Sequence, residues 1–181
     1  MSKKNPVVKT DPYEIVWRDG EPMDRRTLSA LVRAERKAKM RVRVVQGSYQ
    51  ELYGGGASAS AHTHDRGGVL DISVAGMTRR QRIRFARSMK RRGFAIWYRH
   101  GPGWAGNEHL HAVLRWHRNL HPEALAQEAD YDAGRNGLVS HLADRTWRPL
   151  VRRHWSHRQQ RIVREKPGAK RPGLWPWPKR G

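Results

Sequence analysis

An aspartate inside an apolar segment is the feature that most restricts how this chain can fold. Residues 69–74 have the alternation of a β-strand, with Leu70, Ile72 and Val74 on one face and Asp71 on the other. A carboxylate in the middle of such a strand is costly to bury unless it is paired or bound to a metal ion. The fold must therefore bring partners to Asp71 from other segments.

Two histidines are the candidate partners. His64 lies seven residues before Asp71, and the Gly67-Gly68 pair between them lets the chain turn sharply enough for both side chains to converge. His111 follows Glu108 in a second motif and belongs to a predicted strand over 109–116. Two imidazoles, one carboxylate and a second carboxylate nearby are the inventory of a catalytic zinc site.

Either motif alone would be weak support for a metal site. A histidine in a lone His-x-His on a strand is more often a core or surface residue than a ligand, and a histidine seven residues before an aspartate is less specific still. The ligand types alone would also accept divalent metals other than zinc.

The composition limits the class of protein. The chain has 181 residues and no cysteine, so disulfides and thiolate ligands are excluded. No stretch approaches the roughly 20 apolar residues of a membrane span, and the basic N-terminus lacks the apolar core of a signal peptide. We therefore expect a protein that stays in the cytoplasm of the producing cell until something other than a signal sequence releases it, or that is carried in a virion.

A formal net charge of +21 indicates a solvated basic surface or an anionic partner, which could be nucleic acid, a wall polymer or a membrane surface. The charge is concentrated at the C-terminus, where residues 145–181 hold twelve Lys and Arg against a single acid, Glu165. Half of the eight Trp lie there too. Cationic, Trp-rich segments bind anionic wall polymers or lipid headgroups, and the same residue types also bind nucleic acid.

Hydrophobic periodicity predicts an α+β fold: a small antiparallel sheet with helices packed on one side and the zinc site in a groove on the other face. The domain boundaries are a flexible arm over 1–12, a metal-binding domain over 13–117 and a basic Trp, Pro and Arg-rich extension over 118–181. That extension either wraps on the domain or hangs free. We expect a monomer. The predicted strands cover residues 13–18, 41–45, 69–74, 94–98 and 109–116, and the predicted helices cover 24–39, 78–92 and 121–130.

The two motifs together resemble the zinc D-Ala-D-Ala carboxypeptidase and L-alanyl-D-glutamate endopeptidase family, whose fold is shared with hedgehog and lysostaphin-type domains. The family pattern Ser-x-His-x-x-Gly-x-Ala-x-Asp is matched by residues 62–71 (HTHDRGGVLD), and Glu-x-x-His by residues 108–111 (EHLH). The resemblance implies one Zn²⁺ held by His64, Asp71 and His111, with Glu108 as catalytic base. The resemblance covers residues 24–116. Within the family, this sequence looks most like members from actinobacteria and their phages.

Three positions depart from the family pattern. His62 stands where the family has Ser, and Val69 where it has Ala. Many members carry Arg at the end of a Ser-Gly-Tyr-Arg turn, and the matching residues 47–50 (GSYQ) end in Gln50. An amide can donate to a developing oxyanion but cannot pair bidentately with a carboxylate. This favours endopeptidase cleavage inside a stem peptide over strict carboxypeptidase action.

Further residues complete the predicted site. Ser48, Tyr49 and Arg66 are expected to contact substrate, and either Arg66 or Arg18 could replace the family's arginine. His109 lies on the face of His111, where it would donate to the tetrahedral intermediate or only pack against a ligand. His62 is expected to be a bystander or to support a ligand.

The resemblance implies a zinc peptidase that cleaves bacterial peptidoglycan, in the manner of a bacteriophage endolysin. In that mechanism Glu108 takes the proton of the attacking water and passes it to the leaving amine. Two other functions stay open. The chain could be a nucleic-acid or anionic-polymer binding protein whose basic tail carries the interaction, or a family member that binds the wall without cutting it.

Overall fold

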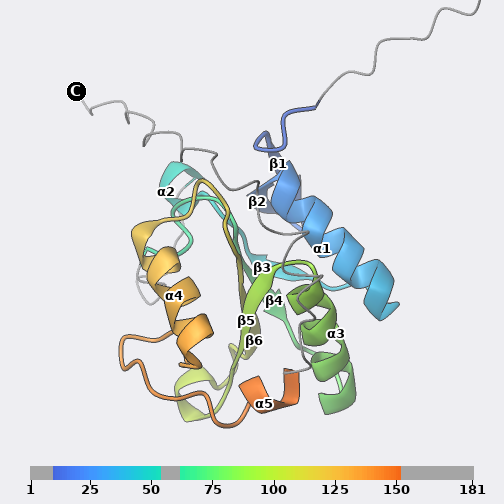
Figure 1. Ribbon diagram of the computed structural model, residues 1–181. Coiled ribbons are helices and arrows are strands. Elements are labelled where there is room, and N and C mark those ends of the chain that lie inside the picture. Colours follow the sequence, from blue (N-terminus) through green and yellow to red (C-terminus); the bar gives the residue numbers. More distant parts are fainter. Residues whose placement is uncertain (1–9, 54–61, 152–181) are drawn as a thin grey trace, which may run out of the picture.

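The computed structural model describes residues 10–53 and 62–151 (Figure 1). Within them a four-stranded antiparallel sheet has the order β3-β4-β6-β5, and a separate two-stranded hairpin pairs β1 with β2. The predicted arm over 1–9 and the tail over 152–181 lie outside the described residues. The strands are β1 Ile15–Arg18, β2 Glu21–Asp24, β3 Val44–Gln46, β4 Val69–Ser73, β5 Phe94–Arg99 and β6 His109–Leu114.

The helices begin where their capping residues place them. The Asp24 side chain accepts a hydrogen bond from the Thr27 backbone N–H and so starts the first helix. Thr78 and Gln81 form a capping box at the start of the third helix, which was predicted to begin at residue 78. The helices are α1 Arg25–Ala38, α2 Gln50–Tyr53, α3 Arg79–Arg91, α4 Pro122–Ala133 and α5 Arg148–Val151, with a 3₁₀ turn η2 at Pro102–Trp104.

The α+β class and the antiparallel sheet are confirmed, with two local differences in the strands. The strand predicted over 41–45 is shorter and later, because β3 begins at Val44 and has an irregular register with β4. Strand β2 was not predicted. Its sequence contains Pro22 between charged residues, which hides the usual alternation of a strand.

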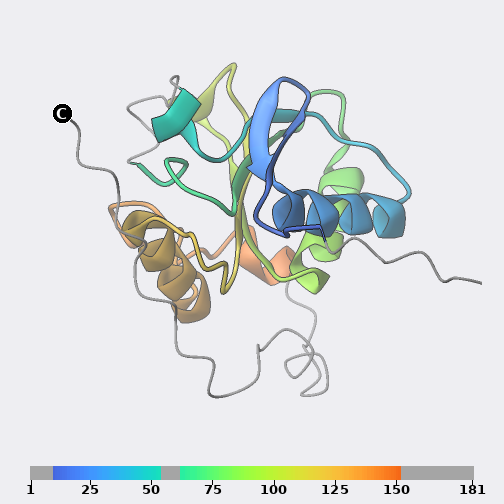
Figure 2. The ribbon, with the colours of Figure 1, turned by 90° about the horizontal axis from the view of Figure 1, so that it is seen from above.

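The two faces of the sheet bury different clusters. Leu70, Ile72 and Val74 pack with α1 and α3, as the alternation of this segment predicts. Val69 and Trp97 lie on the opposite face with Ala124 and Tyr131 of α4. Figure 2 shows α4 and the α1–α3 pair on opposite sides of the sheet.

The prediction that the helices pack on one side of the sheet is therefore wrong for α4. Residues 118–151 pack onto the sheet, which is one of the two arrangements expected for the extension (Figure 1). Helix α4 shares the face of Asp71, so the extension borders the predicted metal site. In the described part of the chain no helix has the length and apolar character needed to cross a membrane.

A buried ion pair joins the start of α1 to the turn after β6. His117 Nε2 lies 3.0 Å from Asp24 Oδ2, and both side chains are fully buried. Burial alone would raise the pKa of the Asp24 carboxyl, but the hydrogen bond and charge of His117 and the bonds from Thr27 hold this pKa below its ordinary value. Gly67 and Gly68 lie against His117, where an added Cβ would come within 2.6 and 2.9 Å of its ring. The ring of His117 therefore leaves room only for glycine at these two positions of the turn.

Replacing Asp24 with Asn tests the pair. At pH 5 we expect a loss of about 3 kcal/mol in the free energy of unfolding, because the substitution removes the buried carboxylate that contacts His117 and Thr27. A depressed carboxyl pKa stabilises the fold above the ordinary value near 4 and loses this contribution as the pH falls through the folded pKa. Urea unfolding should therefore show a larger drop in stability between pH 5 and pH 3 for wild type than for Asp24→Asn.

Glu14→Gln is the matched control, because it neutralises a half-exposed carboxylate paired with Arg25 on the surface. Its effect should stay within about 0.5 kcal/mol. Equal losses between pH 5 and pH 3 in wild type and Asp24→Asn would contradict a charged buried pair.

Candidate metal centre

Adjacent strands bring the predicted ligands together. Asp71 of β4 is directly opposite His111 of β6 in the antiparallel register, and His64 reaches the same point from the turn before β4. One ligand atom from each of these three buried residues lies within 4.8 Å of the others. The predicted metal ligands are thus the group that the structure gathers.

The contacts converge on one carboxylate. His111 Nδ1 lies 2.8 Å from Asp71 Oδ1, and His64 Nε2 lies 3.4 Å from the same oxygen. The side chains of all three residues are at most 9% exposed. Four-coordinate zinc with ligands at 2.0–2.1 Å separates its donor atoms by roughly 3.3 Å. The observed separations require only small adjustments to hold such an ion.

The outer nitrogens of both imidazoles face neutral oxygen atoms. His64 Nδ1 lies 2.8 Å from the Gly47 carbonyl oxygen, and His111 Nε2 lies 2.8 Å from Gln127 Oε1. The Gln127 amide is oriented by its own nitrogen, which donates to the Gly137 carbonyl at 3.0 Å. Its oxygen therefore points at His111. Carbonyl oxygens only accept hydrogen bonds, so the proton of each neutral ring belongs on the outer nitrogen.

This arrangement directs lone pairs at the Asp71 carboxylate. A neutral imidazole has one N–H, and the outer acceptors use it, so in the neutral form of both rings His64 Nε2 and His111 Nδ1 face Asp71 with unprotonated nitrogen. A second proton on a ring would make a hydrogen bond to Asp71, and a metal ion between the three groups would take the place of that proton. The donor set therefore fits a divalent metal ion that accepts nitrogen and oxygen ligands, and zinc is a typical one.

The electrostatics of the group agree with a site made for a cation. Burial alone would raise the pKa of the Asp71 carboxyl, but the charges and hydrogen bonds of His64 and His111 hold it well below its ordinary value. Burial would lower the pKa of His64, yet the Asp71 carboxylate raises it above its ordinary value. Burial lowers the pKa of His111, and Arg99 and His64 add to this effect. A permanent carboxylate beside a poorly protonated imidazole favours a metal ion over a second proton.

His109 is a third imidazole on the same carboxylate. Its Nε2 lies 3.4 Å from Asp71 Oδ2, and its Nδ1 lies 2.8 Å from the Asn107 carbonyl oxygen. By the same reasoning the proton belongs on Nδ1, so Nε2 carries the lone pair. The Trp104 ring packs edge-on against it with ring centroids 5.2 Å apart. His109 thus lies beside the predicted ligands, on the face where the alternation of β6 predicts it.

Glu108 is not brought to this group. Its Oε2 accepts a hydrogen bond of 3.0 Å from the Tyr98 hydroxyl. Tyr98 pairs with Leu110 in the register and packs toward the core on the α1–α3 side, whereas His111 is on the opposite face. The carboxylate predicted as catalytic base therefore points away from Asp71 in this structure.

Ser48 and Tyr49 use their hydroxyls on the protein itself. Ser48 Oγ donates to the Val69 carbonyl at 2.7 Å and accepts from the Val69 N–H at 3.0 Å, so it fixes the turn to β4. The Tyr49 hydroxyl donates to Asp24 at 3.4 Å, and burial, followed by the charge of Asp24, raises the pKa of this phenol. Substrate contact by either residue stays a prediction.

The remaining predicted residues lie around the site. Gln50 is buried, and its amide approaches Glu21 and the Gly47 carbonyl at 3.4 and 3.5 Å. Arg66 lies close enough to His121 for its charge to lower the pKa of that histidine, after burial as the main cause. His62 is exposed and pairs with Asp65 at 2.7 Å, outside the metal-binding group.

Arg18, one of the two arginines predicted as a possible substrate contact, is engaged elsewhere in the protein. It forms a two-pronged ion pair with Glu35, with distances of 2.6 and 3.0 Å, at the end of the hairpin. Arg99 is the buried arginine on the metal face, because it follows Trp97 on the same side of β5. It donates to the carbonyls of Asn136 and Gly137 at 2.6 and 3.2 Å.

Sequence reasoning missed Arg99 and Gln127. The signal for Arg99 was an arginine at the end of an apolar strand, on the side of the strand that faces the histidines. Gln127 gave no comparable signal, because it lies in a predicted helix whose placement over the site depends on tertiary packing.

Comparison of the chain with protein-family models, curated proteins and solved structures finds no match.

Gln127→Ala tests whether α4 completes the centre. Loss of the acceptor on His111 Nε2 should weaken metal binding by about 10- to 100-fold, the usual effect of removing a group that orients a metal-ligating histidine. Competition for zinc with a chelator whose optical signal changes on metal binding measures this affinity directly.

Gln127→Glu keeps an oxygen opposite His111 and should retain most of the affinity. Glu123→Ala, in the first turn of the same helix, should leave the affinity unchanged. If Gln127→Ala binds zinc as tightly as wild type, the contact does not hold the ligand.

Proposed function

We propose that the protein is a zinc-dependent peptidase that hydrolyses a peptide bond in the stem peptide or cross-link of bacterial peptidoglycan. One observation carries this proposal: His64, Asp71 and His111 converge, with the outer nitrogen of each ring held by a neutral oxygen. Three protein ligands leave a fourth position open, as in catalytic zinc sites. When bound, zinc supplies a Lewis acid that polarises a peptide carbonyl and makes water more acidic.

His109 is the base that the geometry favours. With its proton on Nδ1, opposite the Asn107 carbonyl, Nε2 would accept the proton of the attacking water and return it to the leaving amine. The Asp71 carboxylate, 3.4 Å away, would stabilise the imidazolium formed in between. Glu108 is the base implied by the motif resemblance, and it would have to leave Tyr98 to serve.

The substrate class rests on the resemblance of residues 62–71 and 108–111 to the peptidoglycan peptidase family. The described residues support cleavage inside a peptide more than removal of a C-terminal residue. Gln50 offers no charge for a terminal carboxylate, and both Arg18 and Arg99 are engaged by Glu35 or by backbone carbonyls. Release from the cytoplasm to the wall through a membrane lesion made by another protein, followed by lysis of the phage-infected cell, would fit such an enzyme.

A non-catalytic wall-binding protein is the second candidate. The observation that favours it is the deep burial of the ligands, since His64 is 1% exposed and His111 5% exposed. A structural zinc site is closed in this way, whereas a catalytic site needs room for substrate. The two candidates predict the same metal content and differ only in turnover.

The test combines metal content with the release of new amino groups from purified peptidoglycan. Wild type should hold about one zinc per chain and release amines. His109→Gln should keep its zinc and lose activity by at least about 100-fold, the usual contribution of a general base. Removal of the metal with a chelator should abolish release, and added zinc should restore it.

Glu108→Gln is the matched comparison, because it neutralises the neighbouring candidate base. From its bond to Tyr98 we expect much less loss than in His109→Gln. The reverse order would assign the base to Glu108. If wild type and both variants hold zinc but none of them releases amines from any peptidoglycan tested, the result would support the non-catalytic wall-binding protein.

A further inference from the structure

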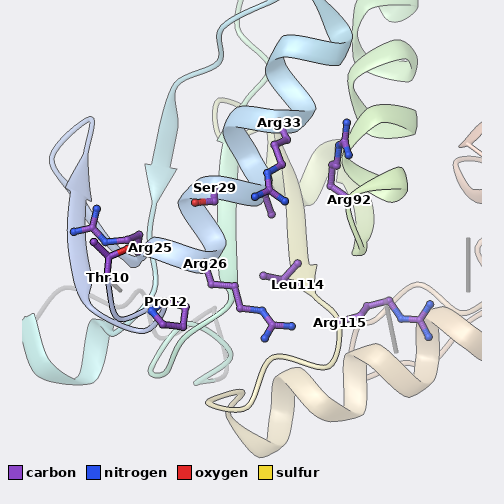
Figure 3. Close-up of a pocket in the computed structure, with 10 residues that line it drawn as sticks. Thr10, Pro12, Arg25, Arg26, Ser29, Arg33, Arg92, Leu114 and Arg115 are labelled. Carbon is purple, nitrogen blue, oxygen red and sulfur yellow. The ribbon is translucent and has the colours of Figure 1, made fainter. Parts of the chain in front are cut away.

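A cationic pocket lies on the side of the sheet opposite the metal centre. Its volume is about 340 Å³, and it is bounded by the start of α1, the residue after α3 and the end of β6. Figure 3 shows Arg26 and Arg33 of α1 extending on either side of Leu114. The residues lining the pocket are Thr10, Pro12, Arg25, Arg26, Ser29, Ala30, Arg33, Arg92, Leu114 and Arg115.

Five of these ten residues are arginines, and the lining contains no acid. Arg25 pairs with Glu14, and Arg115 pairs with Asp132, both at the margins of the pocket. Arg33 and Arg92 are exposed, and among residues 10–53 and 62–151 no acid pairs with either. Two arginines that line the pocket therefore have no acidic partner in the described part of the chain.

The helices around the pocket extend this positive charge. Together α1 and α3 hold twelve Lys and Arg and one acid, Glu35. Glu35 is already bound by Arg18 of the hairpin. The segments outside the described residues contain a single acid, Glu165, so they offer little charge to neutralise this face. This face is therefore complementary in charge to an anionic partner.

The residue types that line the pocket favour some kinds of anion over others. Arginine forks bind phosphate bidentately, and the hydroxyls of Thr10 and Ser29 are further donors for phosphate oxygens. The apolar part of the lining consists of Pro12, Ala30 and Leu114, and no aromatic ring lines the pocket. It therefore lacks the stacking platform that single-stranded nucleic acids use.

The recessed shape also disfavours a duplex. Double-stranded DNA has a persistence length of about 150 bp, so it cannot bend locally to place a phosphate inside the pocket as a flexible chain can. A polymer of phosphodiesters joined by short polyols has both the charge and the flexibility to enter. It also presents aliphatic carbons to Leu114 and Pro12.

We propose that this pocket binds the phosphate groups of a polyol-phosphate polymer of the bacterial wall. The choice of a wall polymer rests on the proposed function, whereas the anion site itself does not. Because pocket and metal centre lie on opposite faces of the sheet, the polymer can hold the protein while a peptide occupies the centre.

The experiment measures binding of the full-length protein to poly(glycerol phosphate) by calorimetry in 0.15 M salt. A double variant, Arg33→Ala with Arg92→Ala, should lose at least about tenfold in affinity. The slope of log K against log salt should fall by about 1.4, since each lost phosphate contact of a single chain contributes about 0.7.

Arg80→Ala with Arg84→Ala is the matched control. It removes two exposed charges from α3 that do not line the pocket, and its affinity should change less than threefold. An equal loss in both double variants would overturn the pocket in favour of diffuse attraction. Tighter binding of a 20-bp duplex or of oligothymidine, with the same dependence on Arg33 and Arg92, would assign the site to nucleic acid and overturn the proposal.

Poly-L-glutamate tests whether phosphate is recognised, and it should bind at least tenfold more weakly than the phosphate polymer. Equal binding would contradict a phosphate site. The polymer contains no peptide bond, so this result is independent of amine release from peptidoglycan. Failure of the peptidase proposal and failure of the pocket proposal can therefore be told apart.

Discussion

The buried carboxylate of Asp71 is the constraint on which the arrangement of this protein depends. It lies in the centre of the sheet, and three imidazoles from two segments face it. Each of these rings is held from behind by a carbonyl or amide oxygen, of Gly47, Asn107 or Gln127. Burying such a cluster is energetically unfavourable without a cation. The cluster lies where strand β4, the turn before it and helix α4 meet.

Much of this was accessible from sequence because it depends on local periodicity. The alternation of residues 69–74 placed Asp71 opposite the core, and the capping box of Thr78 placed the start of α3. The Gly67-Gly68 turn was required for His64 to approach Asp71, and the close contact of both glycines with His117 shows why larger residues would not fit. Ligand type and spacing then identified the candidate metal group.

The parts that sequence did not predict depend on packing between distant segments. Gln127 reaches His111 only because α4 folds back over the sheet, and no pattern within α4 specifies that contact. Glu108 illustrates a different limit. The two-residue period of β6 puts it on the face opposite His109 and His111, whereas the motif resemblance assigned it to their site.

The two faces of the sheet have separate chemistry. The α4 face concentrates imidazoles around one carboxylate, and the α1–α3 face carries arginines that its own acids do not balance. One face is suited to a metal ion and a peptide, the other to an extended polyanion. The arginine charge of α1 and α3 therefore lies on the face opposite the candidate metal group.

The most direct measurement of the central claim is X-ray absorption at the zinc edge of the protein loaded with one equivalent of zinc. The account predicts two imidazole nitrogens at about 2.0–2.1 Å together with carboxylate and solvent oxygens, and one nitrogen fewer in His64→Ala. A spectrum with only oxygen ligands, or one that His64→Ala leaves unchanged, would contradict a centre built from His64, Asp71 and His111.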